Sequence, residues 1–378
     1  MRAAGLYIHV PFCLSKCSYC DFISYIYTEE AAERYAAAVE QEIILRSKEF
    51  RSHNVVGSIY FGGGTPTCLP GTVLCGILAV IRRNFMVLPQ AEITVEANPG
   101  TAGGDLLELL RGEGVNRLSI GMQTGEQELL RFLGRRHTPE DVAKTVEAGR
   151  AAGFDNINLD LIFGIPGQSI RIWEKSLEEA TALSPEHISA YGLEIHHKTP
   201  LGREVAAGTV SPCPEEDERK MYFTAIDLLC ARGYEHYEIS NFALSDRSSR
   251  HNRLYWEGEP YLGFGPAAHS CINGTRWSNV EDLKKYCEIL DRNGLPATGE
   301  TRLSVKEEMS EAMFLGLREI AGVSCARFKE RFGRGPEKVY GPVIEKLFTQ
   351  GLLRREGDSL RLTREALPVA NVVFAAFV

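Results

Sequence analysis

The sequence predicts an α/β protein: an incomplete barrel of six strand–helix units, open on one side, followed by an irregular segment and a winged-helix-like domain. Short apolar runs alternate with helical patterns through the first half of the chain, which is typical of parallel strands joined by right-handed crossovers. In addition, nearly every expected strand runs into a polar or glycine-rich motif at its C-terminal end. That rim is where α/β barrels place their functional sites.

The expected strands are short, apolar and bounded mostly by Gly, Pro or Asn. They cover residues 6–10, 58–61, 92–97, 117–121, 157–163 and 187–191. Apolar residues at helical spacing fill the intervals between them. The expected helices cover residues 29–50, 72–84, 104–111, 139–152 and 170–183. Together these repeats predict a barrel domain over residues 1–210.

The pattern changes after residues 199–201. An acidic run begins a helix expected to reach about Arg232, and an irregular, aromatic and glycine-rich stretch follows over residues 234–279. We therefore expect an extension of the barrel over residues 211–300. Helical patterns then precede a hairpin, which predicts a winged-helix-like domain over residues 301–378. Its expected elements are helices at 305–320, 325–332 and 337–350 and a hairpin at 352–362.

The composition is that of an ordinary globular protein, with 44% hydrophobic and 24% charged residues in 378. The net charge of -8 argues against a general nucleic-acid binder, which would present a basic face. No apolar run approaches the ~20 residues of a membrane span, and the N-terminus lacks the apolar stretch of a secretory signal. Ten cysteines, mostly scattered singly, are typical of a reducing compartment. These features predict a cytoplasmic protein.

Three cysteines follow the first expected strand: Cys13, Cys17 and Cys20 form a C-x3-C-x2-C pattern. Three thiolates this close together can hold three irons of one cubane cluster and leave the fourth iron open to a small ligand. A zinc site completed by His9 or Cys68 is the alternative. Structural zinc usually takes four protein ligands with paired Cys-x-x-Cys spacing, and the chain has no second such pair. The spacing therefore favours an iron–sulfur cluster.

Polar residues end the next strands. The glycines at 62–64 would let a ligand approach the backbone, because no Cβ intervenes, although a tight turn explains them equally well. Glu96, Gln123 and Asp160 fall on the third to fifth expected strands, where carboxylates can accept hydrogen bonds from ribose hydroxyls. Arg135, in the loop after the fourth strand, could bind a carboxylate through two hydrogen bonds. A solvated rim and a surface ion pair are the structural alternatives.

The segment 251–256, His-Asn-Arg-Leu-Tyr-Trp, falls in the stretch expected to be irregular. A histidine imidazole can be an axial ligand of heme iron, and flanking aromatic rings can stack on the macrocycle. Spacing alone favours a packed cluster of His251 and its aromatic neighbours. His269 is a second candidate of the same kind.

Taken together, these motifs resemble those of the radical S-adenosylmethionine (SAM) enzymes. The branch that they resemble is the HemN-like one, which contains the oxygen-independent coproporphyrinogen III oxidase and a heme chaperone. The resemblance covers essentially the whole chain. It rests on residues 7–20, 60–67, 96–100, 133–138, 158–168 and 251–256.

The resemblance implies a [4Fe–4S] cluster on Cys13, Cys17 and Cys20, with SAM chelating the open iron through its amine and carboxylate. An electron donor would reduce the cluster, and electron transfer into SAM would produce a 5′-deoxyadenosyl radical. The resemblance also implies which residues form the SAM pocket. They are Tyr7, Tyr19, Gly63, Gly64, Thr65, Glu96, Gln123, Arg135, Asp160 and Gly192.

One position separates the two activities of the branch. The oxidase has a further cysteine two positions after the third, and this chain has Phe22 there. His251 belongs to an HNxxYW pattern that is similar to the heme-binding signature of the chaperone. The resemblance thus implies a heme chaperone that binds heme and passes it to an acceptor apo-hemoprotein, without coproporphyrinogen oxidase activity. The oxidase and a redox sensor are the alternatives; a monomer, a dimer and a peripheral membrane association all stay open.

Overall fold

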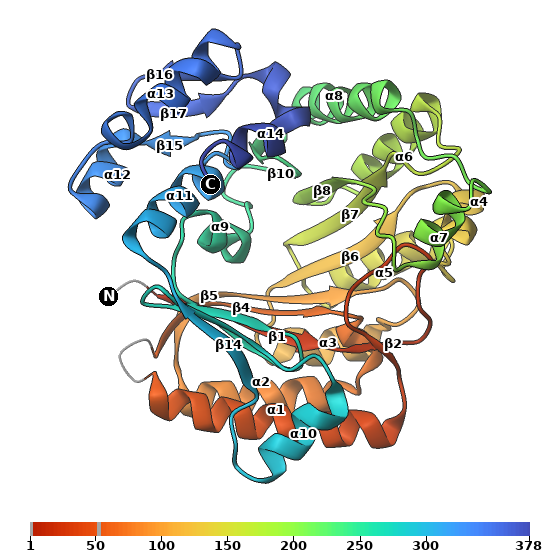
Figure 1. Cartoon of the computed structure of the whole chain (residues 1–378). Helices are drawn as coiled ribbons and strands as arrows, with labels where there is room; N and C mark the ends of the chain where they lie inside the picture. Colours follow the sequence, from red (N-terminus) through yellow and green to blue (C-terminus); the bar gives the residue numbers. More distant parts are fainter. Residues whose placement is uncertain (1–2, 51–53) are drawn as a thin grey trace.

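The structure is a computed structural model that describes residues 3–50 and 54–378 (Figure 1). Six parallel strands form the open barrel, and all six predicted strands are present. They are β1 (Ala4–Val10), β4 (Val55–Gly63), β5 (Met86–Ala97), β6 (Arg117–Gln123), β7 (Ile157–Phe163) and β8 (His187–Gly192). Neighbouring strands pair in parallel in this order. The barrel prediction is therefore confirmed.

Helices connect these strands, and the five predicted ones agree with the structure to within one residue at each end. They are α1 (Glu29–Glu49), α2 (Gly71–Asn84), α3 (Gly104–Gly112), α5 (Pro139–Ala151) and α6 (Ile170–Ala182). Side-chain caps fix several of their starts. Thr28 caps α1, and Thr138 forms a reciprocal capping box with Asp141 at the start of α5.

Alternate residues along the barrel strands face opposite sides, as the pleat requires. Ile59 and Phe61 of β4 belong to the large apolar core that includes helix residues such as Ile43 of α1. Tyr60, between them, hydrogen-bonds Glu96 of β5 instead. Polar residues repeat this inward pattern on the other strands. Buried examples are Ser58, Thr94, Arg117, Ser119, Asn158, His187 and Ser189. The barrel therefore has an apolar outside under its helices and a polar, hydrogen-bonded inside.

The sheet does not close. Within the described residues it has 12 strands in the order β14-β13-β12-β11-β1-β4-β5-β6-β7-β8-β10-β9. β11 (Tyr261–Phe264) pairs in parallel with β1, and β10 (Asn241–Ala243) pairs antiparallel with β8. The remaining added strands are β9 (Glu235–Glu238), β12 (His269–Ile272), β13 (Thr275–Asn279) and β14 (Ala297–Arg302). Strands outside the barrel thus extend both edges of the parallel sheet.

The expectation of an irregular stretch over residues 234–279 is wrong. That stretch contains β9 to β13 and the helix α9 (Arg250–Trp256). Each of these strands has three to five residues, which is too short for an alternating pattern to stand out in a sequence. They become regular structure because β10 and β11 pair with the free backbone groups of the barrel edges, and the remaining strands pair outward from these two.

Several short elements complete the barrel and its extension. They are β2 (Phe12–Cys13), β3 (Tyr25–Ile26), η2 (Pro66–Cys68), α4 (Gln127–Phe132), α7 (Pro200–Ala206), α8 (Glu215–Ala231) and α10 (Leu283–Asp291). The predicted helix after the acidic run is α8. Among the helices of the described residues, none combines the length and the apolar character that crossing a membrane requires.

The C-terminal region has its own buried cluster, which includes Met313, Leu360 and Val373. The predicted helices and hairpin are all present. They are α11 (Val305–Gly316), α12 (Cys325–Phe332), α13 (Pro336–Thr349), β16 (Leu353–Glu356) and β17 (Ser359–Leu362). β15 (Val323–Ser324), η3 (Arg364–Val369) and α14 (Ala370–Ala375) were not predicted. The domain boundaries at residues 210 and 300 stay predictions.

A buried carboxylate joins the barrel to its extension. Glu42 of α1 is fully buried, and its Oε2 accepts hydrogen bonds from the Gly265 backbone N–H (2.9 Å) and the Tyr286 hydroxyl (2.6 Å). Its Oε1 accepts one from Asn279 Nδ2 (2.7 Å). Burial raises the pKa of Glu42 to about 7, while these hydrogen bonds act in the opposite direction.

We expect Glu42→Gln to change how the free energy of unfolding depends on pH. The folded-state pKa of about 7 lies above the usual glutamate pKa of 4.5, so the folded protein binds this proton more tightly than the unfolded chain does. The stabilisation from Glu42 is therefore complete below pH 4.5 and is lost as the pH rises to about 7. Urea denaturation at several pH values should show the wild type losing stability relative to Glu42→Gln across this window. Parallel profiles would contradict the expectation.

Candidate cofactor site at the barrel rim

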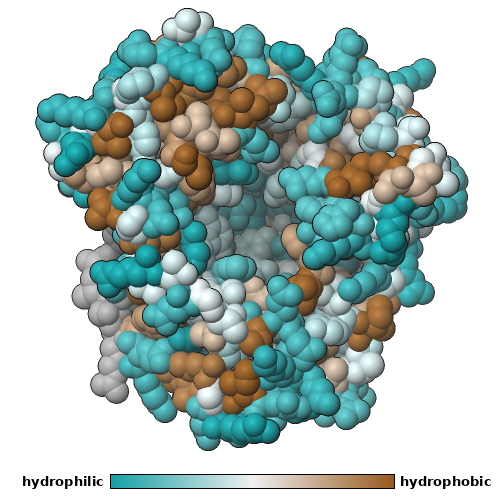
Figure 2. All heavy atoms as spheres, viewed as in Figure 1, coloured by the Kyte–Doolittle hydropathy of each residue, from teal (hydrophilic) through white to brown (hydrophobic). Residues whose placement is uncertain are grey.

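A cavity of about 460 Å³ lies at the C-terminal ends of the barrel strands, beneath the loop that carries the three cysteines. The space-filling view shows the molecule hollowed near its centre, with mostly hydrophilic residues around the hollow (Figure 2). Of the predicted site residues, all but Tyr7 and His251 line the cavity. They are Cys13, Cys17, Tyr19, Cys20, Gly63, Gly64, Thr65, Glu96, Gln123, Arg135, Asp160 and Gly192.

The cysteine loop is fixed over the rim by backbone hydrogen bonds to two neighbouring segments. Gly64 N–H donates to the Val10 carbonyl (2.8 Å) and Thr65 N–H to the Phe12 carbonyl (2.6 Å). On the far side of the loop, Ser18 N–H donates to the Leu133 carbonyl (3.0 Å). The loop is therefore attached to the glycine segment after β4 and to the segment after α4, which positions its thiols before any ligand is considered.

Two glycines after β4 allow this close approach. A Cβ added at Gly64 would lie 2.5 Å from the Phe12 carbonyl oxygen, so only glycine fits without moving the loop. Gly63 has a φ of +109°, and its N–H donates to Glu96 Oε2 (3.1 Å). The glycine motif thus has a packing role toward the cysteine loop as well as an open face toward the cavity.

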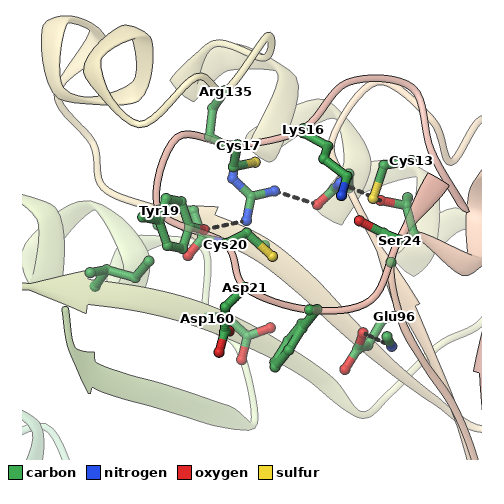
Figure 3. Close-up of a pocket in the computed structure, with 18 of the residues that line it drawn as sticks. Cys13, Lys16, Cys17, Tyr19, Cys20, Asp21, Ser24, Glu96, Arg135 and Asp160 are labelled. Atoms are coloured by element: carbon green, nitrogen blue, oxygen red, sulfur yellow. Dashed lines mark hydrogen bonds between the residues drawn. The ribbon is translucent and has the colours of Figure 1, made fainter. Parts of the chain in front are cut away.

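The three cysteine side chains are partly buried and surround one end of the cavity, with Arg135 close by (Figure 3). Burial raises the thiol pKa values of Cys17 and Cys20, and the positive charge of Arg135 opposes that rise. A bound metal cluster would also lower these thiol pKa values, because its positive charge stabilises the thiolate forms as that of Arg135 does.

Arg135 is the centre of a polar chain that reaches the cysteines. Its Nη1 donates to Asn98 Oδ1 (2.8 Å) and its Nη2 to the Tyr19 hydroxyl (2.7 Å). Asn98 Nδ2 donates to Thr65 Oγ1 (2.7 Å), and Thr65 Oγ1 lies 3.7 Å from Cys13 Sγ. The Nε of Arg135 is buried and has no hydrogen-bond partner. The guanidinium therefore orients three cavity residues, and it has no carboxylate partner in this structure.

The opposite wall is acidic. Glu96 accepts a hydrogen bond from the Tyr60 hydroxyl (2.8 Å), and Asp160 accepts bonds from Ser119 Oγ and Asn158 Nδ2 (2.9 Å each). Burial and the nearby Asp160 charge raise the pKa of Glu96 to about 7. Figure 3 shows both carboxylates across the cavity from the cysteines. This wall can accept hydrogen bonds from hydroxyl or ammonium groups.

Gln123 and Gly192 shape the floor of the cavity. Gln123 ends β6 with a φ of 66°, an uncommon left-handed conformation for a side-chain-bearing residue, at an irregularity in the β6–β7 pairing. A Cβ added at Gly192 would approach Glu218 Oε1 to 3.0 Å. Strain and close packing concentrated at one rim are common features of functional sites.

His9 is not available as the fourth ligand of a zinc site. Its Nε2 contacts the Ile23 carbonyl (2.9 Å) and its Nδ1 the Tyr7 hydroxyl (3.2 Å), so both ring nitrogens are engaged. Within residues 3–50 and 54–378, no three His, Cys, Asp or Glu side chains are grouped closely enough for a single ion. A cubane cluster does not require the three thiolates to meet at one ion, because each thiolate would bind a different iron.

Tyr7 and His251 lie outside the cavity. Tyr7 is directed toward His9, as its hydrogen bond shows. His251 is in α9 rather than in irregular structure, and only 1% of its surface is exposed. His269, by contrast, is exposed on β12. The structure therefore does not bring His251 together with the cysteines.

Other residues of the cavity were not singled out in the sequence. Tyr60 and Ser119 follow from the inward alternation of their strands, and Asn98 belongs to the quoted motif 96–100. Lys16, inside the cysteine loop, and Tyr191, at the end of β8, also line the cavity. Strand alternation was the available signal for Tyr60, but its use required the order of the strands in the sheet.

Comparison with known proteins agrees with this geometry. The model of the Radical SAM superfamily matches residues 7–180, and that of the HemN C-terminal domain matches residues 303–369. The chain is 38% identical to the heme chaperone HemW of Bacillus subtilis, over 98% of both chains. It is 34% identical to HemW of Lactococcus lactis, over 98% of this chain and 96% of that protein. The chain belongs to the HemW family of radical SAM proteins.

The chain is also similar to an animal protein. A mitochondrial radical SAM domain-containing protein 1 of Mus musculus is 32% identical over 97% of this chain and 86% of its own length. The structure of the Escherichia coli coproporphyrinogen III oxidase HemN, a radical SAM enzyme, superposes with a TM-score of 0.88. That similarity covers 100% of this chain and 90% of HemN at 23% identity, so it establishes the shared fold alone. The HemW family thus shares the HemN architecture.

We expect Gly64→Ala to reduce cluster binding, because the added Cβ would push the Phe12 backbone and the cysteine loop away from the rim. Iron and sulfide counted after anaerobic reconstitution should fall to a small part of the wild-type content. Gly103→Ala is the matched control, since a Cβ there meets nothing within 4 Å. Equal iron content in Gly64→Ala and Gly103→Ala would show that the close contact does not position the cysteines.

Proposed function

We propose that this protein binds heme and transfers it to an acceptor hemoprotein, on a scaffold that holds a [4Fe–4S] cluster and SAM. The supporting observation is the 38% identity, over 98% of both chains, to a protein named as a heme chaperone. Phe22, at the position where the oxidase has a further cysteine, also favours the chaperone. The coproporphyrinogen oxidase is the second candidate, because HemN has the same fold.

The cavity residues fit the cofactors in kind. Cys13, Cys17 and Cys20 would hold the cluster, and the bound cluster and SAM would supply one-electron reductive chemistry. Glu96 and Asp160 would accept hydrogen bonds from the ribose hydroxyls of SAM. The cavity volume of about 460 Å³ is in the range of small-molecule sites.

Arg135 would act mainly by positioning. Both of its Nη atoms are already used to orient Tyr19 and Asn98. Its charge would favour the thiolates of Cys17 and Cys20. The cysteine loop above these residues would limit the access of water to the open iron.

The cavity has more carboxylates than cations. Its ionisable side chains other than the cysteines and tyrosines include two cations and four carboxylates. They are Lys16, Arg135, Asp21, Glu96, Asp160 and Glu194, with His196 at the same mouth. The positively charged sulfonium centre of SAM suits such a wall.

Heme would occupy a different place. Tyr255 of the HNxxYW segment lines a second cavity of about 420 Å³, together with Tyr261, Cys271 and Arg276. Its aromatic rings suit a planar ligand. Arg276 already donates to both carboxylate oxygens of Glu311 (2.8 and 2.9 Å), so binding a heme propionate there would require this pair to open. Ligation of heme iron by His251 stays a prediction. Its two ring nitrogens contact Ser58 and Tyr255, and one of these contacts would have to break before the imidazole could bind iron.

We expect the purified wild type to bind heme at about one equivalent per chain and to lose it to an apo-hemoprotein on mixing. Titration followed by absorption spectroscopy, and then separation of the two proteins, measures both steps. His251→Ala should weaken heme binding, and His197→Ala is the matched control because His197 is exposed and is not a candidate ligand. Unchanged affinity in His251→Ala would discard His251 as a ligand, and no heme binding by the wild type would refute the chaperone.

We also expect no conversion of coproporphyrinogen III. The assay supplies SAM, a reductant and anaerobic conditions to cluster-loaded protein, with the Escherichia coli enzyme as a positive control. The reason is that Phe22 stands where the oxidase has a further cysteine. Product formed at a rate comparable with the control would favour the oxidase.

A further inference from the structure

A column of aromatic rings runs inside the barrel between the candidate SAM cavity and α9. The ring of Tyr60 lies on that of His251 with their centroids 5.2 Å apart and their planes at 29°. Tyr7 flanks both, at 6.2 Å from Tyr60 and 6.5 Å from His251. Tyr255 meets the other side of His251 edge-on at 5.1 Å. His251 is therefore the central ring of a packed stack.

The position of His251 is fixed at each of its polar atoms. Nδ1 contacts Ser58 Oγ (2.8 Å) and Nε2 contacts the Tyr255 hydroxyl (2.9 Å). Its backbone N–H donates to Glu92 Oε1 (3.1 Å) at the start of α9. Burial lowers the pKa of His251 to about 3, so the ring is neutral near pH 7. A neutral, buried and fully hydrogen-bonded imidazole is suited to holding its neighbours in place.

The neighbour that connects His251 to the candidate SAM cavity is Tyr60. Its ring packs against both Tyr7 and His251, and its hydroxyl donates to Glu96 Oε1 (2.8 Å). Glu96 in turn lines the cavity assigned to SAM. One side-chain hydrogen bond and one ring contact thus separate His251 from a cavity carboxylate.

We propose that His251 is a positioning residue for the adenosyl pocket: by packing on Tyr60 it fixes the phenol that orients the Glu96 carboxylate toward the ribose. This role rests on the SAM pocket of the proposed function, and it is distinct from ligation of heme iron. His251, in the HNxxYW segment, would thus contribute to the cofactor site at the opposite end of the barrel interior. The segment would then link the C-terminal half of the chain to the cofactor site.

The pH dependence of ligand binding would report the protonation of Glu96, and with it the hydrogen bond from Tyr60. Groups that face Glu96 are Tyr60 and the Gly63 N–H, which donate to it, and the charges of Asp160 and Arg117. Tyr7 also lies within its electrostatic reach. The Tyr60 hydrogen bond lowers the pKa of Glu96, so its loss should raise that pKa. A ligand that needs the carboxylate form would then bind with a higher pH midpoint.

The test measures binding of 5′-deoxyadenosine to cluster-loaded full-length protein from pH 5 to 9. This nucleoside is the right probe because it lacks the methionine amine and carboxylate of SAM, whose own titration would enter the profile. For the wild type, we expect affinity to rise with pH to a midpoint near the Glu96 pKa of about 7. For His251→Ala and Tyr60→Phe, we expect roughly tenfold weaker binding near pH 7 and a higher midpoint.

Controls separate positioning from general loss of structure. His269→Ala should behave as the wild type, and Tyr255→Phe, which removes one hydrogen bond to His251 without a large change in volume, should shift the midpoint in the same direction by a smaller amount. The double variant of His251→Ala and Tyr60→Phe should be little weaker than either single variant, because both act on Glu96. Circular dichroism and iron content check folding.

A wild-type affinity and midpoint in His251→Ala would overturn the proposal, whatever happens to heme binding. Additive losses in the double variant would also overturn it. If His251→Ala does not fold, Tyr255→Phe decides, and an unchanged midpoint there counts against the proposal. Failure of the wild type to bind the nucleoside at any pH would instead refute the SAM pocket of the proposed function.

Discussion

The alternation of inward and outward side chains along six parallel strands is the constraint on which the site depends. Outward residues such as Ile59 and Val95 belong to the apolar core, while inward residues such as Tyr60, Glu96 and Asp160 form hydrogen bonds inside the barrel. A polar interior is stable only because its members satisfy one another. Since parallel strands end at one rim, the same alternation delivers carboxylates, amides and hydroxyls to a single cavity.

The cysteine loop depends on that rim for its position. Gly64 and Thr65 donate backbone hydrogen bonds to residues 10 and 12, so the thiols lie above the carboxylate wall, and Arg135 extends a polar chain back toward Cys13. From the opposite end, Glu92 of β5 accepts two backbone N–H groups of α9. The barrel interior is thus continuous from the cysteine loop to the C-terminal half of the chain, which is why a histidine in α9 can influence a cavity at the other end.

Much of the architecture followed from sequence pattern. Six strands, five connecting helices and the C-terminal helices and hairpin were all predicted, because each has enough residues to show its own periodicity. The short strands from β9 to β13 were missed, since they are regular only through pairing: β10 and β11 pair with the barrel edges, and the others pair outward from these two. At the cavity, spacing identified Cys13, Cys17 and Cys20 and motif resemblance identified its carboxylates, but Asn98 and Tyr60 needed the observed contacts.

The sequence by itself determined the fold class and the three cysteines and strand-end residues of the rim, because local spacing and strand ends are properties of short segments. Only the tertiary structure decided which distant residues touch. His251 meets Ser58 across 193 residues of chain and meets Tyr60 through ring packing, and no local pattern encodes such a pairing. The physical reason is that side-chain contacts inside a barrel depend on the register and order of all its strands at once.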